Sequence, residues 1–360
     1  MKTAKKIILW VVGIICTLIL LALLYVGISL THLVLHEYKP TPLETISITG
    51  EASKVPGTNE TFSIMTWNIG YGALGDNADF FMDGGKQVNT ANKKRVNKNL
   101  TDIANAIKEV NPDIFFLQEA DVNSSRSHKI NEIAFIQKEF SNYGNTYASN
   151  FNVDFLPYPL PPIGHVEAGV STFSSYKISN AERIQLPCPF TGILKAGNLK
   201  RCLLVSRVPL NNSSKELVLV NLHLEAYDSG EGKIAQTKQL KDFLQSEYDK
   251  GNYVIAGGDF NQSFSSVDLS SCPVLEGMWT PGIIEEEEFS SDWNFLMDGS
   301  KPSCRSLDKV YSTADKENFQ YYIIDGFIVS KNVEVNNIET VNLNFEATDH
   351  NPVVMEVTLS

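Results

Sequence analysis

Residues 347–357 read ATDHNPVVMEV, in which an acidic residue and a histidine directly precede an apolar, strand-like run. An Asp before a strand often only initiates a turn, and a single His is usually a polar group at the surface. Asp349 and His350 therefore indicate a functional site only if carboxylate, amide or imidazole groups occupy equivalent positions elsewhere in the chain.

Other strand-like runs also finish in such groups. They are Asn68 in FSIMTWN, Glu119 in IFFLQE, His223 in LVLVNLH, Asp259 and Asn261 in YVIAGGDFN, and Asp325 in YYIID. Each residue alone has an ordinary interpretation, as a turn residue, a solvated loop residue or a hydrogen-bonded core histidine. Because strand ends at one edge of a sheet converge in space, the set together predicts a single polar pocket.

The runs that carry these residues predict a sheet-rich α/β (α+β) domain. Residues 61–69 (TFSIMTWNI) are rich in β-branched and aromatic residues, and residues 112–119 (PDIFFLQE) are apolar enough for a strand covered on both faces. Apolar residues recur at helical spacing over residues 96–110 and 234–244. Buried strands with interspersed helices indicate sheets packed together with helices outside them.

The N-terminal part of the chain predicts a membrane anchor. Residues 7–30 are 24 residues without one charge, and about 20 apolar residues suffice to cross a bilayer as a helix. Lys2, Lys5 and Lys6 precede this run, so the positive-inside bias places the N-terminus in the cytoplasm and the rest of the chain outside. A cleaved signal peptide is the alternative, but the run is long for one and no Ala-x-Ala-like site follows it.

These features divide the chain into four parts. We expect residues 1–6 to be a cytoplasmic stub, residues 7–30 the transmembrane anchor, residues 31–60 a Pro- and Gly-containing tether, and residues 61–360 one folded domain that carries the predicted polar pocket.

Charge and cysteine content restrict the partners only mildly. The formal net charge is −12, which would repel a long polyanion unless cations or a local basic groove intervened. The four cysteines of the exported part could form two disulfides, Cys188–Cys202 and Cys272–Cys304, or remain free thiols, because a domain of this size needs no covalent staples.

The motifs TWNIG, FLQE, NLHL, GGDFN, IDGFIVS and TDHNPV, in this order over residues 61–360, resemble those of the endonuclease/exonuclease/phosphatase superfamily. This superfamily has the fold of pancreatic-type deoxyribonucleases. The resemblance implies a four-layer sandwich of two packed mixed β-sheets flanked by helices. It also implies divalent-metal-dependent attack of water on a phosphate ester.

Carried over onto this sequence, the resemblance implies metal ligands and a water-activating pair. Glu119 and Asn68 resemble the metal-binding pair, with Asp349 as a further candidate, and hard oxygen ligands of this kind suit Mg²⁺ or Mn²⁺. Asp259 and Asn261 resemble the Asp-x-Asn pair that positions and deprotonates the attacking water.

The resemblance also implies two imidazoles at the phosphate. His350 resembles the imidazole that faces the scissile phosphate, oriented by Asp325. His223 resembles the second imidazole, and Glu167 in HVEAGVSTF is its candidate carboxylate partner. Many relatives carry an Arg shortly after the Glu of the LQE motif, and Arg126 could take that place or could be a surface residue.

Two loops depart from the pattern of the nucleic-acid enzymes. Residues 70–86 form a Gly- and Asp-rich insertion, whose Asp83 could reach the pocket rim or lie on an ordinary surface loop. Residues 155–164 (FLPYPLPPIG) are an aromatic and proline-rich stretch, which could form an apolar rim for a lipid surface or pack across the edge of the sandwich.

The sequence therefore predicts a monomeric, membrane-anchored, Mg²⁺- or Mn²⁺-dependent phosphoesterase, with a phospholipid head group or small phosphate ester favoured over nucleic acid as substrate. A cell-surface nuclease and a non-catalytic surface binding module are the alternatives. The sequence contains no basic stripe interleaved with aromatic residues, which a duplex-binding face would require.

Overall fold

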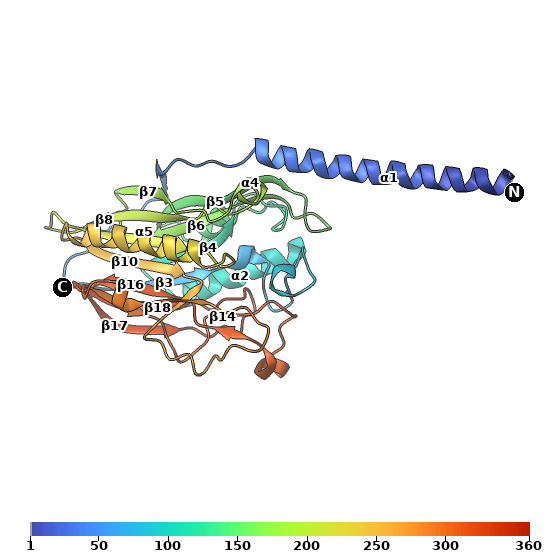
Figure 1. Cartoon of the computed structure of the whole chain (residues 1–360). Coiled ribbons are helices and arrows are strands. Elements are labelled where there is room, and N and C mark those ends of the chain that lie inside the picture. The colour runs from blue at the N-terminus through green and yellow to red at the C-terminus, as the bar shows by residue number, and fades with distance from the viewer. Residues whose placement is uncertain (1) are drawn as a thin grey trace.

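The protein is built around two seven-stranded mixed sheets packed face to face, as the computed structural model of residues 2–360 describes (Figure 1). The first sheet has the order β1 (Leu43–Thr45), β7 (Asn180–Gln185), β8 (Cys202–Pro209), β9 (Glu216–His223), β10 (Tyr253–Asp259), β16 (Asp325–Ser330) and β13 (Trp293–Leu296). The second has the order β17 (Val333–Thr340), β18 (Val353–Leu359), β3 (Thr61–Asn68), β4 (Ile114–Asp121), β6 (Gly164–Ser174), β5 (Gly144–Leu156) and β2 (Ile48–Thr49).

Helices and two short strand pairs complete the fold. The helices are α1 (Lys2–Leu35), α2 (Lys93–Val110), α3 (Glu132–Glu139), α4 (Gly192–Ala196) and α5 (Glu231–Tyr248). The strand pairs are β11 (Gln262–Phe264) with β12 (Gly282–Ile284), and β14 (Cys304–Arg305) with β15 (Tyr321–Tyr322).

The central strands are buried on both faces, as their continuous apolar runs predict. In β4, Ile114 and Phe116 belong to the core between the two sheets, whereas Phe115 and Leu117 pack in a second core that includes α2 and α3. Helix α5 packs in a third core on the outer face of the first sheet. These cores separate helix, sheet, sheet and helix layers, so the predicted four-layer sandwich is confirmed.

Helix α2 begins and ends at residues whose side chains and backbone suit helix ends. The Asn92 side chain accepts a hydrogen bond from the Arg95 N–H, which satisfies one free donor of the first turn. Asn111 follows the last turn in the left-handed conformation, with φ of 50°, and Pro112 cannot continue the helix. The predicted helix over residues 96–110 is therefore confirmed, and it begins at Lys93.

Helix α1 is long and apolar enough to cross a membrane, and it projects from the body of the protein (Figure 1). The following segment, which the sequence suggests to be a tether, lies against the domain instead. Strand β1 pairs with β7, and β2 pairs with β5. These two strands cover edges of the sheets, where backbone N–H and C=O groups would otherwise have no strand partner. This pairing makes strands within a segment whose Pro and Gly content suggested a tether.

Glu247, near the end of α5, ties this helix to the first sheet. Its two carboxylate oxygens each accept a hydrogen bond of 2.9 Å from the guanidinium of Arg207 in β8, and Asn252 donates a third, also 2.9 Å. Burial alone would raise the pKa of Glu247, but the hydrogen bonds from Arg207 and Lys250 outweigh it and lower this pKa to about 2.

Glu247→Gln is expected to lower the free energy of unfolding by about 2–3 kcal/mol at pH 7, because two pKa units correspond to about 2.7 kcal/mol. A depressed pKa stabilises the fold above the unfolded value of about 4.3, and this contribution is lost as pH falls through about 2. Urea unfolding of the detergent-solubilised chain at pH 7 and pH 2.5 measures both effects. Asp242→Asn, which removes an exposed ion pair with Lys238 on the same helix, is the control and should cost less than about 1 kcal/mol.

All five cysteines of the described residues are free thiols, including the four that could have formed two disulfides. The fold is therefore held by its cores and backbone pairing.

Candidate functional site

The first sheet brings three of the predicted residues side by side. Strands β9 and β10 are parallel neighbours and β16 runs antiparallel to β10, so the register pairs Asp259 with His223 on one side and with Asp325 on the other. Asp325 begins β16 rather than ending a strand, but the antiparallel direction still places it at the same edge. Asp259 Oδ2 lies 3.4 Å from His223 Nε2.

The second sheet supplies Asn68 and Glu119 to the same point. Asn68, the last residue of β3, donates from Nδ2 to Asp259 Oδ2 at 3.0 Å and to Glu119 Oε1 at 3.2 Å. Glu119 lies at an irregularity in the pairing of β4 and has a φ of 52°. Such bulges re-aim a side chain, and here Glu119 Oε1 lies 4.0 Å from His223 Nε2.

Gly70 allows the segment that carries Asp349 to approach the end of β3 closely. It has a φ of +49°, and a Cβ at this position would lie 3.0 Å from Asp349 Oδ1 and 2.9 Å from Leu74 Cβ. The Thr348 hydroxyl also donates to the Asn68 carbonyl at 3.1 Å. The glycine of TWNIG therefore matters because a side chain there would push Asp349 away from the site.

A buried carboxylate, that of Asp325, holds the His350 ring at Nδ1. Its Nδ1 lies 2.9 Å from Asp325 Oδ2, which also accepts a 2.7 Å hydrogen bond from the Ser303 hydroxyl. Its other ring nitrogen, Nε2, lies 3.9 Å from Asp259 Oδ2. The two carboxylates thus lie on opposite sides of one imidazole.

Asn261 completes the support of Asp259. Its backbone N–H donates to Asp259 Oδ1 at 2.9 Å, and its side-chain Nδ2 donates to the Leu224 carbonyl at 2.9 Å. The Asp259 carboxylate is therefore held at both oxygens, by Asn261 at Oδ1 and by Asn68 at Oδ2. Such fixed hydrogen bonds position a reacting group before the reaction begins.

The buried carboxylates hold their protons more tightly than carboxylates in water. Burial and the neighbouring Asp325 carboxylate raise the pKa of Asp259 to about 7. Burial and the Asp349 carboxylate also raise the pKa of Glu119. Both shifts mean that negative charge is crowded at this edge of the sheets.

The two imidazoles differ in charge. Burial lowers the pKa of His350, but the hydrogen-bonded Asp325 carboxylate outweighs burial and holds this pKa well above its usual value. Burial, Arg201 and the charge on His350 hold the pKa of His223 well below its usual value, although Asp259 lies beside it. These opposite shifts favour the protonated form of His350 and the neutral form of His223.

Comparison with known proteins agrees with this geometry. The model of the Endonuclease/Exonuclease/phosphatase family matches residues 65–350, which include every residue placed at the site above. The chain belongs to the endonuclease/exonuclease/phosphatase family. No curated protein sequence matches it.

Solved structures share this family fold at low sequence identity. An endonuclease/exonuclease/phosphatase from Beutenbergia cavernae is 17% identical, with a TM-score of 0.55 over 83% of this chain and 72% of that one. The human Nocturnin catalytic domain with bound sulfate is 17% identical, with a TM-score of 0.52 over 88% and 97%. Truncated TDP2 from Caenorhabditis elegans is 16% identical, with a TM-score of 0.51 over 84% and 98%. At this identity these structures show the fold alone.

Members of the endonuclease/exonuclease/phosphatase family are divalent-metal-dependent phosphoester hydrolases, and the residues of this chain fit such an ion. Glu119 and Asp349 supply hard carboxylate oxygens. Asp349 also raises the pKa of Glu119, and a cation beside these two carboxylates would relieve their repulsion. The Asn68 oxygen accepts the Gly70 N–H at 3.0 Å, so in this structure Asn68 serves the site as a hydrogen-bond donor to carboxylates.

Glu167 does not pair with His223, and the prediction of that pair is wrong. Strand β6 pairs with β5 in the second sheet, and the register places Glu167 opposite Asn152. The carboxylates within 4.0 Å of His223 are those of Glu119 and Asp259, both on the Nε2 side. His223 Nδ1 is buried without a hydrogen-bond partner among the described residues.

Arg126 lies behind Glu119 rather than on the surface. Its guanidinium makes two hydrogen bonds to Asp121, of 2.9 and 3.1 Å, and lies 3.6 Å from the centre of the Tyr71 ring. It opposes the rise in the pKa of Glu119. Asp121 accepts two of the five guanidinium N–H donors, and the charge of Arg126 acts on Glu119.

Ser303 and Arg201 contact the site and carried no sequence signal that we recognised, whereas the sequence already offered Asp83 as a candidate for the rim. Ser303 bonds Asp325, and Arg201 donates to the His223 carbonyl at 3.0 Å. Asp83, on the inserted loop, accepts a 2.9 Å hydrogen bond from the Tyr227 hydroxyl. Asp83 therefore reaches the rim, which decides between the two readings of that loop.

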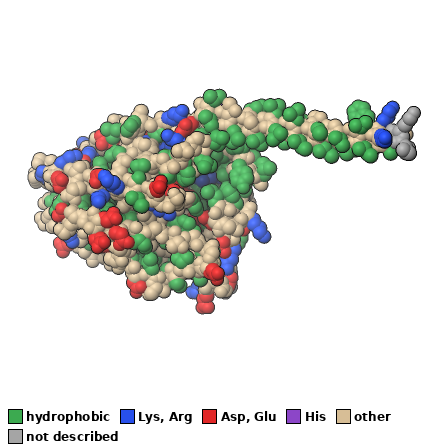
Figure 2. All heavy atoms as spheres, in the orientation of Figure 1, with side chains coloured by type: hydrophobic (Ala, Val, Ile, Leu, Met, Phe, Trp, Pro, Cys, Tyr) green, Lys and Arg blue, Asp and Glu red, His purple; other side chains and the backbone are tan. Residues whose placement is uncertain are grey.

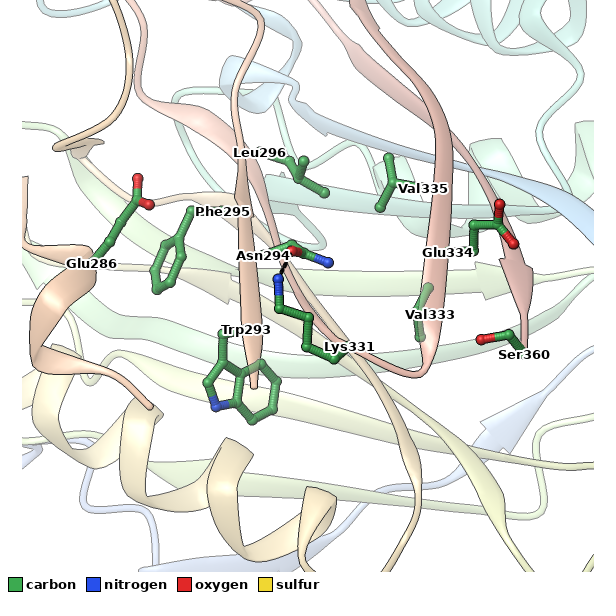
Figure 3. A pocket seen from close by; sticks show the side chains of 10 residues that line it. All are labelled: Glu286, Trp293, Asn294, Phe295, Leu296, Lys331, Val333, Glu334, Val335 and Ser360. Carbon is green, nitrogen blue, oxygen red and sulfur yellow. Dashed lines mark hydrogen bonds between the residues drawn. The ribbon is translucent and has the colours of Figure 1, made fainter. Parts of the chain in front are cut away.

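The open hollow of about 800 Å³ in Figure 3 is a separate feature. It is lined by β13 and by the turn from β16 to β17, including Trp293 and Lys331. Because Ser330 ends β16 and Asp325 begins it, the hollow lies at the end of the first sheet opposite to the site.

Proposed function

We propose that this protein is a membrane-anchored, divalent-metal-dependent phosphoesterase that hydrolyses a phospholipid head group or a small phosphate ester. Helix α1 serves as the anchor, with the lysine-rich N-terminus in the cytoplasm and the catalytic domain outside the cell. The observation that carries the proposed hydrolysis is the position of Asp259, whose Oδ2 lies within 3.9 Å of an amide and two imidazoles.

Asp259 is the proposed general base for the attacking water, positioned together with Asn261. A base is most effective when its pKa lies near the working pH, and burial and Asp325 raise the pKa of Asp259 to about 7. His350, protonated and oriented by Asp325, stabilises negative charge on the phosphoryl oxygens. The lowered pKa of His223 favours its neutral form, and its Nε2 lies 3.4 Å from the same carboxylate.

Glu119 and Asp349 are the proposed ligands of a Mg²⁺ or Mn²⁺ ion. When bound, the ion supplies positive charge that polarises the phosphoryl group. Asn68 holds the Glu119 carboxylate at 3.2 Å, and Arg126 adds positive charge behind it.

The arginines around the site favour a small or membrane-bound ester over nucleic acid. Arg126 is paired with Asp121, and Arg201 with Glu225 at 3.2 Å. Arg305 donates to the Gly75 carbonyl at 2.8 Å. A nuclease needs cations that are available to several backbone phosphates, so these internally paired arginines support the lipid or small-ester reading.

Hydrolysis should require a divalent ion and should select among phosphate esters. The purified full chain in detergent is incubated with Mg²⁺ or Mn²⁺ and, separately, with phospholipid, sugar phosphate, nucleotide and nucleic acid. We expect turnover of a phospholipid or small ester, loss of that turnover with EDTA, and recovery when Mg²⁺ or Mn²⁺ is restored. Preferential cleavage of DNA or RNA would instead establish the cell-surface nuclease.

A binding module without catalytic activity is the remaining alternative. It would turn over no member of that set with or without metal. The spacing of Asp259, Asn68, His223 and His350 speaks against it, because a binding site has no need of a buried carboxylate with a pKa of about 7.

A further inference from the structure

We propose that four exposed apolar residues, Tyr158, Leu160, Ile193 and Leu194, form a docking rim that rests on the lipid bilayer entered by α1. The rim would hold the mouth of the site toward the bilayer surface. This inference deepens the proposed function and depends on it for its biological purpose, although the docking itself can be tested without turnover.

The end of α1 is attached to the domain, so the domain has little freedom to move away from the bilayer. Leu33 is buried in a cluster with Val153 of β5 and Ala196 of α4. It lies three residues beyond the apolar run of residues 7–30, about 5 Å along a helix. Ser29, near the end of that run, is also buried, so the domain packs against α1 directly at the end of the predicted membrane segment.

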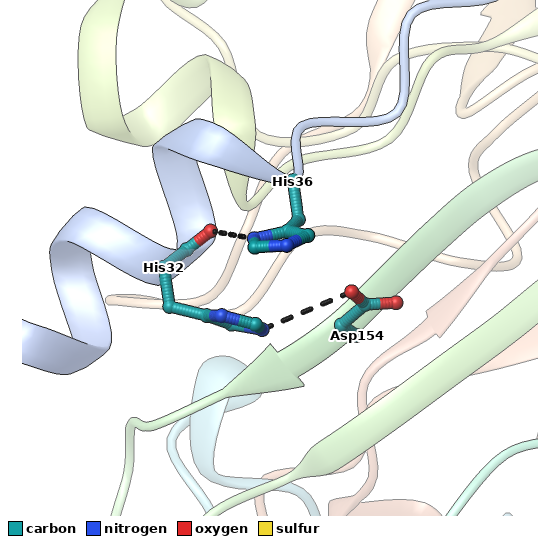
Figure 4. A group of neighbouring side chains, drawn as sticks. All are labelled: His32, His36 and Asp154. Atoms are coloured by element: carbon teal, nitrogen blue, oxygen red, sulfur yellow. Dashed lines mark hydrogen bonds and ion pairs between the residues drawn. The ribbon is translucent and has the colours of Figure 1, made fainter.

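Polar contacts at the same junction support this attachment. His32 Nε2 lies 3.8 Å from Asp154 Oδ2, and the ring of His36 stacks on that of His32 with centroids 4.0 Å apart (Figure 4). Beyond the helix, Glu37 lies 3.5 Å from the buried amino group of Lys200. These contacts connect α1 both to β5 and to the segment after α4.

The docking rim begins where α1 meets the domain. Leu156, which ends β5, packs against the Leu33 cluster. The loop that follows it exposes Tyr158 by 74% and Leu160 by 79%. Helix α4, which packs against α1, exposes Leu194 by 67%. Within the residue 155–164 stretch, Tyr158 and Leu160 therefore face outward, whereas Leu156 packs against the domain.

A chain of contacts links the docking rim to the mouth of the site. The Tyr158 ring lies edge-on to Phe81, with centroids 6.4 Å apart. Phe81 and Asp83 belong to one short helix, and Asp83 accepts the hydrogen bond from Tyr227 just after β9. In Figure 1, α1 leaves the body on the side where β10 ends, opposite the C-terminus. The site and the helix therefore share one side of the molecule.

The lipid bilayer is the occupant that these observations favour. The rim continues the apolar surface of α1, and Figure 2 shows hydrophobic side chains along the helix and on the adjoining part of the body. Tyrosine is enriched at membrane–water interfaces, and the exposed Lys195 beside Leu194 suits the head-group region. Exposed apolar groups of this kind mark an interaction surface.

Depth measurements on the full chain in phosphatidylcholine vesicles test the proposal without turnover. A nitroxide label is attached at Leu160→Cys or Leu194→Cys. Cys16→Ala and Cys188→Ser remove the two cysteines that are not buried. The accessibility of the label to oxygen and to a water-soluble nickel complex is then measured. Ile48→Cys is the control, because Ile48 is 38% exposed and pairs with Thr146 near the opposite end of β5. We expect labels at 160 and 194 to show lipid-like accessibility and the label at 48 to show water-like accessibility.

Activity supplies a second readout that depends on the proposed function. In Tyr158→Ser/Leu160→Ser, we expect the ratio of vesicle-phospholipid turnover to turnover of soluble bis(p-nitrophenyl) phosphate to fall at least about tenfold. Ile48→Ser should leave the ratio unchanged. A ratio unchanged in the rim variant would contradict the proposed orientation of the mouth.

The two proposals fail in different ways. Water-like accessibility at both rim positions would overturn docking, even if the protein hydrolyses a phosphate ester. Spin–spin broadening between labels would show instead that the surface contacts a second copy of the chain. Lipid-like accessibility in a chain that hydrolyses no phosphate ester supports docking and refutes the proposed function.

Discussion

Asp259→Asn is expected to lower phosphate-ester hydrolysis by about 10²- to 10⁴-fold, the usual contribution of a positioned general base. Asparagine has nearly the same shape and can still accept the Asn261 N–H at Oδ1. Its NH2 group replaces the oxygen that accepts from Asn68 Nδ2, and it cannot take a proton from water. Turnover of the preferred substrate at saturating Mg²⁺ and pH 7.5 measures the effect.

The same substitution removes a buried negative charge, and this gain offsets the hydrogen bond lost from Asn68 Nδ2. The pKa of Asp259 is raised to about 7, above the unfolded value of about 3.9, so the folded protein loses stability as pH rises from about 4 to about 7, and this loss is complete at pH 8. Without metal, Asp259→Asn should therefore unfold at the same or a higher urea concentration than the wild type at pH 8. Hydrolysis within threefold of wild type would remove Asp259 from the mechanism.

His350→Ala is the second large expected effect, with turnover reduced about 10²- to 10³-fold, comparable to the loss of one preorganised donor to a developing oxyanion. The alanine removes the protonated ring whose Nε2 lies 3.9 Å from Asp259 Oδ2. Steady-state turnover, with substrate binding measured separately in EDTA, distinguishes a loss of rate from a loss of binding.

Asp325→Asn separates the role of the imidazole from that of its partner. The Asp325 carboxylate holds the pKa of His350 well above its usual value, so the amide should lower that pKa. If activity needs protonated His350, the variant should lose activity at a lower pH than the wild type does. The alkaline limb of its pH–rate profile should therefore lie at lower pH. A profile identical to that of the wild type would show that His350 does not act as a cation.

The sequence predicted the layers well because each layer leaves a local trace. The run IFFLQ in β4 is apolar at every position but the last, and the structure buries its residues alternately against the other sheet and against α2. Helix α2 is visible in the sequence as apolar residues with a 3.6-residue period and as the helix end at Asn111-Pro112. By contrast, β1 and β2 are short and exposed, and only the open sheet edges beside them make them strands.

The structure brings together the predicted site residues that lie at the edge of buried strands. His223, Asp259 and Asp325 are brought together by cross-strand register alone. The Glu167–His223 pair failed because it required a contact between two sheets, and nothing in the spacing along the chain indicates which side of β6 faces β9.

By itself, the sequence determined the type and order of the elements, the apolar character of α1 and the polar residues at the strand ends, because periodicity and composition act between near neighbours in the chain. The tertiary structure alone decided which of those residues meet. Asn68 and Asp259 are 191 positions apart, and their 3.0 Å contact exists because two sheets pack through a shared apolar core. The exposure of the docking rim depends equally on how α1 rests against β5 and α4, since contact between distant segments follows from packing of the whole chain.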